Sequence, residues 1–363
     1  MDTVQTFNKY IFYGTHSQIG LQYGEQLREE IHFHLDIILD LACKHTGLGR
    51  EAVLQSALGF EPYIKKYAPG FCEEIKGISC ASGISYAEAI LLQVRQEVIY
   101  TNTYGGPECT SYVVGGSYTD KGQIYIGQNL DLNGPFEKIS NIVEIRAEGK
   151  PAVMMVLPAG QISNTGLNNL GLGINCNFLS CMGWQKGFPR YLISRLGLEC
   201  STAAEAAALI KTIAERSSSR NFLIADAGGN FVDLEVTPMA IATISTGEEM
   251  FVHSNHFLSD DMLQYDCSRM PDAAISYTDS LWRYSRLKAL MESNHGHINS
   301  DMIKSFLRDH DKGPDDVSSI CMHQCEKNKN YRTVASMISN LTELTFEVAC
   351  GQPCSSSYTK YHF

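Results

Sequence analysis

One cysteine, Cys109, stands where the local sequence changes from turn-forming to strand-forming residues. It follows the turn formers Tyr104-Gly105-Gly106-Pro107-Glu108 and precedes Thr110-Ser111-Tyr112-Val113-Val114, which has the composition of a strand. A thiol can attack a carbonyl carbon when a neighbouring group accepts its proton. A buried, inert thiol is the ordinary alternative, because free cysteines are among the most buried residues. Cys109 is therefore a candidate nucleophile that needs support from the rest of the chain.

That support comes from short motifs on both sides of Cys109. They are His16 to Gly24, Glu73 to Ile78, Leu92 to Glu97, Glu108 to Ser111, Gly127 to Asp131, Gly166 to Leu172 with Asn175 and Asn177, Leu234 to Pro238, and His253 to His256. In this order and spacing the chain resembles the acyl-coenzyme A:6-aminopenicillanic acid acyltransferase family, also called isopenicillin N acyltransferase-like. This family belongs to the N-terminal nucleophile (Ntn) hydrolases, and the resemblance spans nearly the whole chain.

The resemblance implies a precursor that cuts itself between Glu108 and Cys109. One domain, residues 1–363, would then consist of an α fragment (1–108) and a β fragment (109–363) held together in a four-layer αββα sandwich. A free Cys109 would carry both a thiol and an α-amine, and an amine with a pKa of about 8 can accept the thiol proton. Glu108 departs from the small residue, commonly glycine, that relatives carry there, which predicts either slower self-cleavage or a carboxylate in the site until cleavage occurs.

The resemblance also implies roles for further residues. Asn255 is similar to a side-chain donor for the oxyanion, Asp131 to an aspartate that orients the nucleophile and its amine, and Arg332 to a late arginine of the site. Asp131 could instead cap a turn and Asn255 could satisfy buried backbone groups. Arg95 and Asn175 are predicted to bind substrate, although Arg95 could also form an ion pair in the core. No cofactor is implied.

The predicted activity is cleavage or transfer of an acyl group from an N-acyl amide or acyl-thioester through an acyl-enzyme on Cys109. Residue spacing leaves open whether water or an amine accepts the acyl group. It also leaves open whether the chain forms a homo-oligomer.

Composition narrows the classes of partner. The net charge is -11, and 44% of residues are hydrophobic. With no cluster of lysine and arginine, such a chain repels nucleic acid and anionic membranes, which favours a small-molecule substrate. A secretion signal and a long apolar run are both missing from the sequence, so we expect a cytoplasmic protein. The twelve cysteines are accordingly expected to be reduced.

Two other hypotheses remain open at this point. Cys321, His323 and Cys325, with Cys350 and Cys354 nearby, could form a papain-like or metal-binding site. Zinc sites usually contain tighter Cys-x-x-Cys pairs, so no metal is expected here. The chain could also be a scaffold that keeps the fold and never matures.

The elements expected around Cys109 indicate an α+β fold, because blocks of helices and strands alternate without regular βαβ units. Helices are predicted within 17–103 and at 188–199, 202–217, 273–293 and 299–309, with capping boxes beginning at Ser85 and Thr202. Strands are predicted at 110–114, 123–127, 141–147, 152–157, 171–175, 221–226, 231–236, 240–245, 333–340 and 343–349, with a hairpin turn at 227–230.

Overall fold

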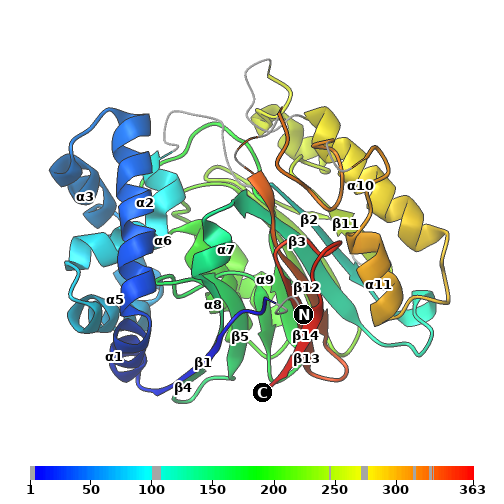
Figure 1. Ribbon diagram of the computed structural model, residues 1–363, viewed down its shortest axis with the longest axis horizontal. Helices are drawn as coiled ribbons and strands as arrows, with labels where there is room; N and C mark the ends of the chain where they lie inside the picture. Colours follow the sequence, from blue (N-terminus) through cyan, green and yellow to red (C-terminus); the bar gives the residue numbers. More distant parts are fainter. Residues whose placement is uncertain are drawn as a thin grey trace.

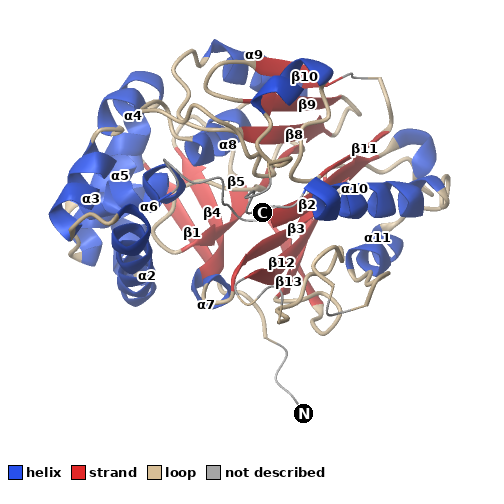
Figure 2. Ribbon diagram, turned by 90° about the horizontal axis from the view of Figure 1, so that it is seen from above, coloured by secondary structure: helices blue, strands red, loops and turns tan. Residues whose placement is uncertain are grey.

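Two β-sheets face each other at the centre of the molecule, and helices cover the outer face of each sheet (Figure 1, Figure 2). The computed structural model describes residues 5–99, 108–244, 247–270, 277–313, 316–326, 329 and 331–363. This arrangement is the four-layer αββα sandwich expected from the sequence, so the α+β fold class is confirmed.

The larger sheet has eight strands in the order β1-β4-β5-β6-β7-β8-β9-β10. Their bounds are β1 (Lys9–Gly14), β4 (Ser140–Ala147), β5 (Val153–Pro158), β6 (Gly166–Asn168), β7 (Leu172–Asn175), β8 (Arg220–Asp226), β9 (Phe231–Val236) and β10 (Ile241–Ile244). β1 pairs in parallel with β4, and the other neighbours pair antiparallel. The beginning of the chain thus adds an edge strand to a sheet built from later residues.

The second sheet has six antiparallel strands in the order β11-β2-β3-β12-β13-β14. Their bounds are β2 (Glu108–Val114), β3 (Tyr125–Asn133), β11 (Met250–His253), β12 (Tyr331–Asn340), β13 (Thr345–Cys350) and β14 (Tyr358–His362). β2 lies between β11 and β3, so Cys109, its second residue, is held within the sheet.

Helices of the N-terminal quarter form one outer layer, at the left in Figure 1: α1 (His16–Gln26), α2 (Arg28–Thr46), α3 (Arg50–Leu58), α4 (Glu61–Tyr67), α5 (Pro69–Ser82) and α6 (Tyr86–Ile99). The short α7 (Phe136–Ile139) follows β3, while α8 (Arg190–Leu198) and α9 (Ala203–Thr212) contact the larger sheet. The other outer layer contains α10 (Tyr277–Glu292) and α11 (Ser300–Leu307), which contact β11 and β12 respectively. Two 3₁₀ helices span Gly116–Tyr118 and Asp260–Tyr265.

Local signals in the sequence account for several of these elements. At the start of α6, the Glu88 N–H donates to Ser85 Oγ at 3.3 Å, and the Glu88 carboxylate accepts from the Ser85 N–H at 2.6 Å, which confirms the capping box. The hairpin of β8 and β9 is also confirmed. The helix predicted for 202–217 is too long, because the Glu215 and Ser217 backbones pair with Phe188 instead.

Two of the N-terminal motifs, His16 to Gly24 and Glu73 to Ile78, allow α1 and α5 to pack closely where they cross. A Cβ atom on Gly20 would lie 2.0 Å from the Glu74 carbonyl oxygen, and one on Gly77 would lie 2.7 Å from the Ser17 carbonyl oxygen. The buried Glu74 carboxylate pairs with Arg195 at 2.5 Å and with His16 at 3.0 Å. Burial alone would raise the pKa of Glu74, but these cations hold it below its usual value.

The twelve cysteines are all free in the structure. Among the described residues, none of the helices combines the length and the apolar character needed to cross a membrane.

Candidate active site

The backbone of Cys109 is held from two directions near the start of β2. Its N–H donates to Asn255 Oδ1 at 2.9 Å, and its carbonyl oxygen accepts from Arg283 Nη1 at 2.8 Å. Arg283 Nη2 also donates to Asn255 Oδ1 at 3.0 Å. Asn255 and Arg283 together fix the peptide groups on both sides of the cysteine.

Asn255 lies just after β11, where the Ser280 hydroxyl accepts its backbone N–H at 2.7 Å. Its Oδ1 accepts the two donors described above, while its Nδ2 donates to the Phe178 carbonyl oxygen at 2.9 Å. Both polar atoms of the Asn255 side chain are therefore engaged in the uncleaved chain. The oxygen, rather than the amide donor, faces Cys109.

Arg283 was not among the predicted site residues. It lies on α10, whose buried face consists of Ser280, Arg283, Leu287 and Met291. A cation on an otherwise apolar or small-residue face requires a buried partner, so this helical spacing was the available signal. The partners are the Cys109 carbonyl oxygen and the Thr110 hydroxyl, the latter at 2.9 Å.

Asp131 is fully buried on β3, where its backbone pairs with Glu108. Thr333 Oγ1 donates to Asp131 Oδ1 at 2.6 Å. Burial and the negative charge of Asp131 raise the pKa of the Cys109 thiol to about 12, although a hydrogen bond from the Asp131 backbone and the charges of Arg220 and Arg283 oppose this shift. The thiol is thus neutral in the uncleaved chain, and Asp131 is close enough to influence its charge.

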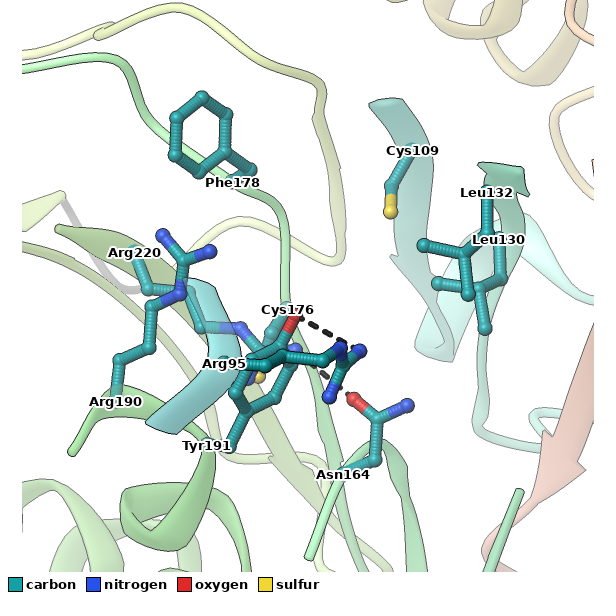
Figure 3. Close-up of a pocket in the computed structure, with 10 residues that line it drawn as sticks. All are labelled: Arg95, Cys109, Leu130, Leu132, Asn164, Cys176, Phe178, Arg190, Tyr191 and Arg220. Atoms are coloured by element: carbon teal, nitrogen blue, oxygen red, sulfur yellow. Dashed lines mark hydrogen bonds between the residues drawn. The ribbon is translucent and has the colours of Figure 1, made fainter. Parts of the chain in front are cut away.

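Cys109 borders a small pocket between the two sheets, with a cavity volume of about 20 Å³, which is room for roughly one water molecule. Figure 3 shows its sulfur pointing into the space between two leucines on one side and a group of arginines on the other. The lining residues are Arg95, Cys109, Leu130, Leu132, Asn164, Cys176, Phe178, Arg190, Tyr191 and Arg220. The Cys109 thiol therefore lies between the apolar side chains of Leu130 and Leu132 and a group of arginine side chains.

Three arginines of this pocket surround the ring of Tyr191. The guanidinium carbons of Arg95, Arg190 and Arg220 lie 4.6, 5.3 and 4.8 Å from the ring centroid. They come from α6, α8 and β8, so the fold gathers them from distant parts of the chain. The face of an aromatic ring attracts cations, which stabilises this cluster in part.

Hydrogen bonds of the three guanidinium groups, among the described residues, go to neutral oxygens. Arg95 Nη2 donates to the Tyr191 hydroxyl at 3.3 Å, Arg190 Nη1 to the Ser219 carbonyl at 3.1 Å, and Arg220 Nη2 to Asn164 Oδ1 at 3.0 Å. Arg95 Nε and Nη1 and Arg220 Nη1 are buried without a hydrogen-bond partner in the described parts of the chain. Burial lowers the pKa of Arg95, and its like-charged neighbours Arg190 and Arg220 add to the effect.

The structure separates the other predicted site residues. Arg95 lines the pocket, whereas Arg332 on β12 pairs with Glu137 at 2.9 Å and is not a lining residue. Asn175 is buried on β7 and is likewise not a lining residue, while the adjacent Cys176 is.

The turn at 104–107 lies outside the described residues, and for Glu108 only the backbone is described, as the first residue of β2. The predicted cleavage between Glu108 and Cys109 therefore stays a prediction.

Comparison with known sequences identifies the family. The model of the family "Acyl-coenzyme A:6-aminopenicillanic acid acyl-transferase" matches residues 118–355. The chain is also 24% identical over 344 residues to the acyl-coenzyme A:6-aminopenicillanic-acid-acyltransferase 40 kDa form of Emericella nidulans, with 94% of this chain and 91% of the relative covered. The chain belongs to the acyl-coenzyme A:6-aminopenicillanic acid acyl-transferase family. Membership supports an enzyme of acyl transfer or amide hydrolysis.

Solved structures also show a likeness. A variant of conjugated bile acid hydrolase from Clostridium perfringens superposes with a TM-score of 0.49 at 13% identity, covering 70% of this chain and 97% of that one. Penicillin V acylase from Agrobacterium tumefaciens superposes with a TM-score of 0.43 at 13% identity, covering 67% and 83% respectively. The sandwich fold is assigned from the sheets and covering helices of this chain itself.

Proposed function

We propose that this protein is a self-processing enzyme that cleaves or transfers an acyl group through a thioester on Cys109. One observation carries the proposal: the backbone nitrogen of Cys109 is held by Asn255 Oδ1 at 2.9 Å while its thiol opens into a cationic pocket. That nitrogen is the atom that self-cleavage would convert into a free amine. Membership of an acyltransferase family supports the chemistry.

Maturation would begin with attack of the Cys109 sulfur on the Glu108 carbonyl carbon. The carbon–nitrogen bond then breaks, the nitrogen takes up a proton, and Glu108 becomes a thioester on Cys109. Water hydrolyses this thioester, which releases the Glu108 carboxylate and the Cys109 thiol. Arg283 supports this step because it hydrogen-bonds to the Cys109 carbonyl oxygen and so holds the backbone on the C-terminal side of the nucleophile in place.

After cleavage, the amine of Cys109 would accept the proton of its own thiol. Asp131 disfavours a thiolate by its negative charge, but it stabilises the ammonium that forms at the same moment. Arg220 and Arg283 favour the thiolate. We therefore assign the Asp131 carboxylate to the ammonium, and the Asp131 backbone N–H with the two arginines to the sulfur, since a charge is stabilised by opposite charges and by hydrogen bonds to it.

Asn255 is best placed to position the amine. Its Oδ1 already accepts from the Cys109 nitrogen, and its Nδ2 is engaged by the Phe178 carbonyl oxygen in the uncleaved chain. A role as oxyanion donor requires that second bond to break. The contact that the structure supports is the one between Oδ1 and the nitrogen.

The pocket favours a substrate with an apolar acyl group and a nearby anionic group. Leu130 and Leu132 offer apolar surface beside the sulfur. Arginine side chains bind carboxylates through paired hydrogen bonds, and the unpaired N–H groups of Arg95 and Arg220 are available for such bonds. An N-acyl amino acid combines both features in one small molecule. An acyl-thioester with an anionic carrier is the second candidate.

Denaturing gel electrophoresis and intact-mass measurement test maturation. We expect fragments ending at Glu108 and beginning at Cys109, and a single full-length chain for Cys109→Ala. Cys80→Ala is the matched control, because Cys80 is an exposed thiol on α5 outside the pocket. Full activity from an uncut wild-type chain would contradict self-processing and favour a chain that works without maturation.

Mass-spectrometric product analysis tests the reaction. The matured protein is incubated with N-acyl amino acids, neutral N-acyl amines and acyl-coenzyme A esters, with and without an added amine acceptor. Peptide mapping after brief incubation should place the acyl group on Cys109. An acyl group on Cys176, the other thiol of the pocket, would overturn the assignment.

A further inference from the structure

Four metal-binding side chains meet away from the pocket: His310, Cys321, His323 and Cys354. One ligand atom from each lies within 4.8 Å of the others. His323 Nε2 is 2.9 Å from His310 Nε2, 3.8 Å from Cys321 Sγ and 3.3 Å from Cys354 Sγ. Cys321 is buried, the histidines are half-buried and Cys354 is exposed.

These distances are close to those of a tetrahedral zinc site. With Zn–N and Zn–S bonds of about 2.0 and 2.3 Å, ligand atoms at tetrahedral angles lie roughly 3.3 to 3.8 Å apart. To reach this geometry the two nitrogens need to separate by about 0.4 Å, and a pair of ligand atoms near the 4.8 Å limit needs to close by about 1 Å. We propose that His310, Cys321, His323 and Cys354 bind one zinc ion.

Ordinary packing explains this cluster less completely. A hydrogen bond between two imidazole rings accounts for the 2.9 Å between His310 and His323. It does not account for two thiols directed at the same nitrogen of His323. Two sulfur and two nitrogen ligands are a set that zinc prefers, and two thiolates neutralise its charge.

The spacing of these residues in the sequence did not indicate a zinc site. The Cys-x-x-x-Cys pairs at 321–325 and 350–354 are looser than those of common zinc motifs, and the structure uses only one cysteine of each. Cys350 is buried on β13, and the chain turns at Gly351, with φ of 82°, before it reaches Cys354. His310 follows α11, so the ligands come from three separate segments.

The site has four protein ligands and no open position, which is typical of structural zinc. Its position connects it to the candidate active site. Met322, between two ligands, accepts the Thr333 N–H at 3.0 Å and donates its own N–H to Thr333 Oγ1 at 2.9 Å. Thr333 Oγ1 in turn donates to Asp131. A bound zinc ion would therefore restrict the movement of the segment around Met322, which hydrogen-bonds to Thr333 and through it supports Asp131. The four ligands would act on the candidate active site only by positioning Asp131.

Metal analysis of the purified full-length chain tests the proposal. We expect about one zinc per chain after growth with zinc, and loss of most of it in Cys354→Ser and in His310→Ala. Cys325→Ser is the matched control: it removes a half-exposed cysteine of the same region that lies outside the cluster. Zinc-free wild-type protein, or equal loss in Cys325→Ser, would overturn the proposal.

Cobalt provides a second readout that does not depend on enzymatic activity. Co²⁺ added to chelator-treated wild type should give the visible absorption of a tetrahedral ion with thiolate charge-transfer bands, and Cys109→Ala should give the same spectrum. This separates the metal site from the proposed function. A Cys321–Cys354 disulfide in freshly purified protein, seen by peptide mass, would refute zinc binding.

Discussion

Replacement of Arg95 by methionine should make the protein more stable and less active at the same time. Arg95 is 1% exposed and lies beside two other cations, and two of its nitrogens have no hydrogen-bond partner among the described residues. Methionine keeps much of the contact with the Tyr191 and Phe136 rings, which are 4.6 and 5.2 Å from the guanidinium. Replacing buried charged groups by apolar side chains of similar volume is often neutral or stabilising, by up to about 4 kcal/mol.

The loss of activity in Arg95→Met should appear only with anionic substrates. A hydrogen bond to a charged group contributes about 1.5 to 3 kcal/mol, which corresponds to roughly 10- to 150-fold in kcat/KM. A suitable pair is N-octanoylglycine and N-octanoylpropylamine, which share the acyl chain and differ in the carboxylate. Arg95→Met should lower kcat/KM for the first by that factor and change the second by less than about threefold.

Arg195→Met is the matched control for the stability measurement. Arg195 is equally buried and packs on the Phe71 ring at 4.9 Å, but it pairs with Glu74 at 2.5 Å. Its removal leaves a buried carboxylate without this partner and should destabilise by about 3 to 5 kcal/mol. Thermal unfolding should therefore shift in opposite directions for the two variants. A lower melting temperature for Arg95→Met, with equal losses on both substrates, would refute the reasoning.

Three further predictions concern maturation and pH. Asn255→Ala should lower the rates of self-cleavage and turnover by about 10²-fold through misplacement of the reacting nitrogen, measured by gel and product assay, whereas loss of turnover alone would argue against amine positioning. Glu108→Gly should speed self-cleavage in a gel time course without changing kcat of the matured enzyme. Burial, with the charge of Arg95, lowers the pKa of His34 to about 3, so the unfolded chain takes up the proton first as pH falls below about 6.5. Stability should drop by about 1.4 kcal/mol per pH unit from this group, and His34→Asn should flatten the profile of melting temperature between pH 7 and 5.

Patterns of local sequence predicted most of the fold. Capping residues, a hairpin turn and alternating strands act over a few residues, so α6 and the pair β8–β9 could be located before any tertiary contact was known. β1 was missed because its partner β4 lies more than a hundred residues away. Pairing of an edge strand with such a distant partner leaves no short-range pattern in the sequence from which the strand could be predicted.

The site was predictable only where a motif carried it. Cys109, Asp131 and Asn255 lie in recognisable motifs, and the structure brings all three together. Arg283 belongs to a helix with no motif, and Arg332 pairs with Glu137 and does not line the pocket. The convergence of Arg95, Arg190 and Arg220 on one ring depends on how three elements pack, which one-dimensional spacing does not encode.

The parallel pairing of β1 with β4 affects how the protein could refold after cleavage. Residues 9–14 would belong to the α fragment after cleavage, yet they complete a sheet of the β fragment, and the Tyr361 hydroxyl donates to the Phe7 carbonyl at 3.0 Å. The precursor folds as one chain, in a first-order process. The cut enzyme, once denatured, would have to reassemble from two chains, so its recovery would depend on protein concentration. Maturation as proposed would thus turn a reversible fold into one that dilution prevents from re-forming.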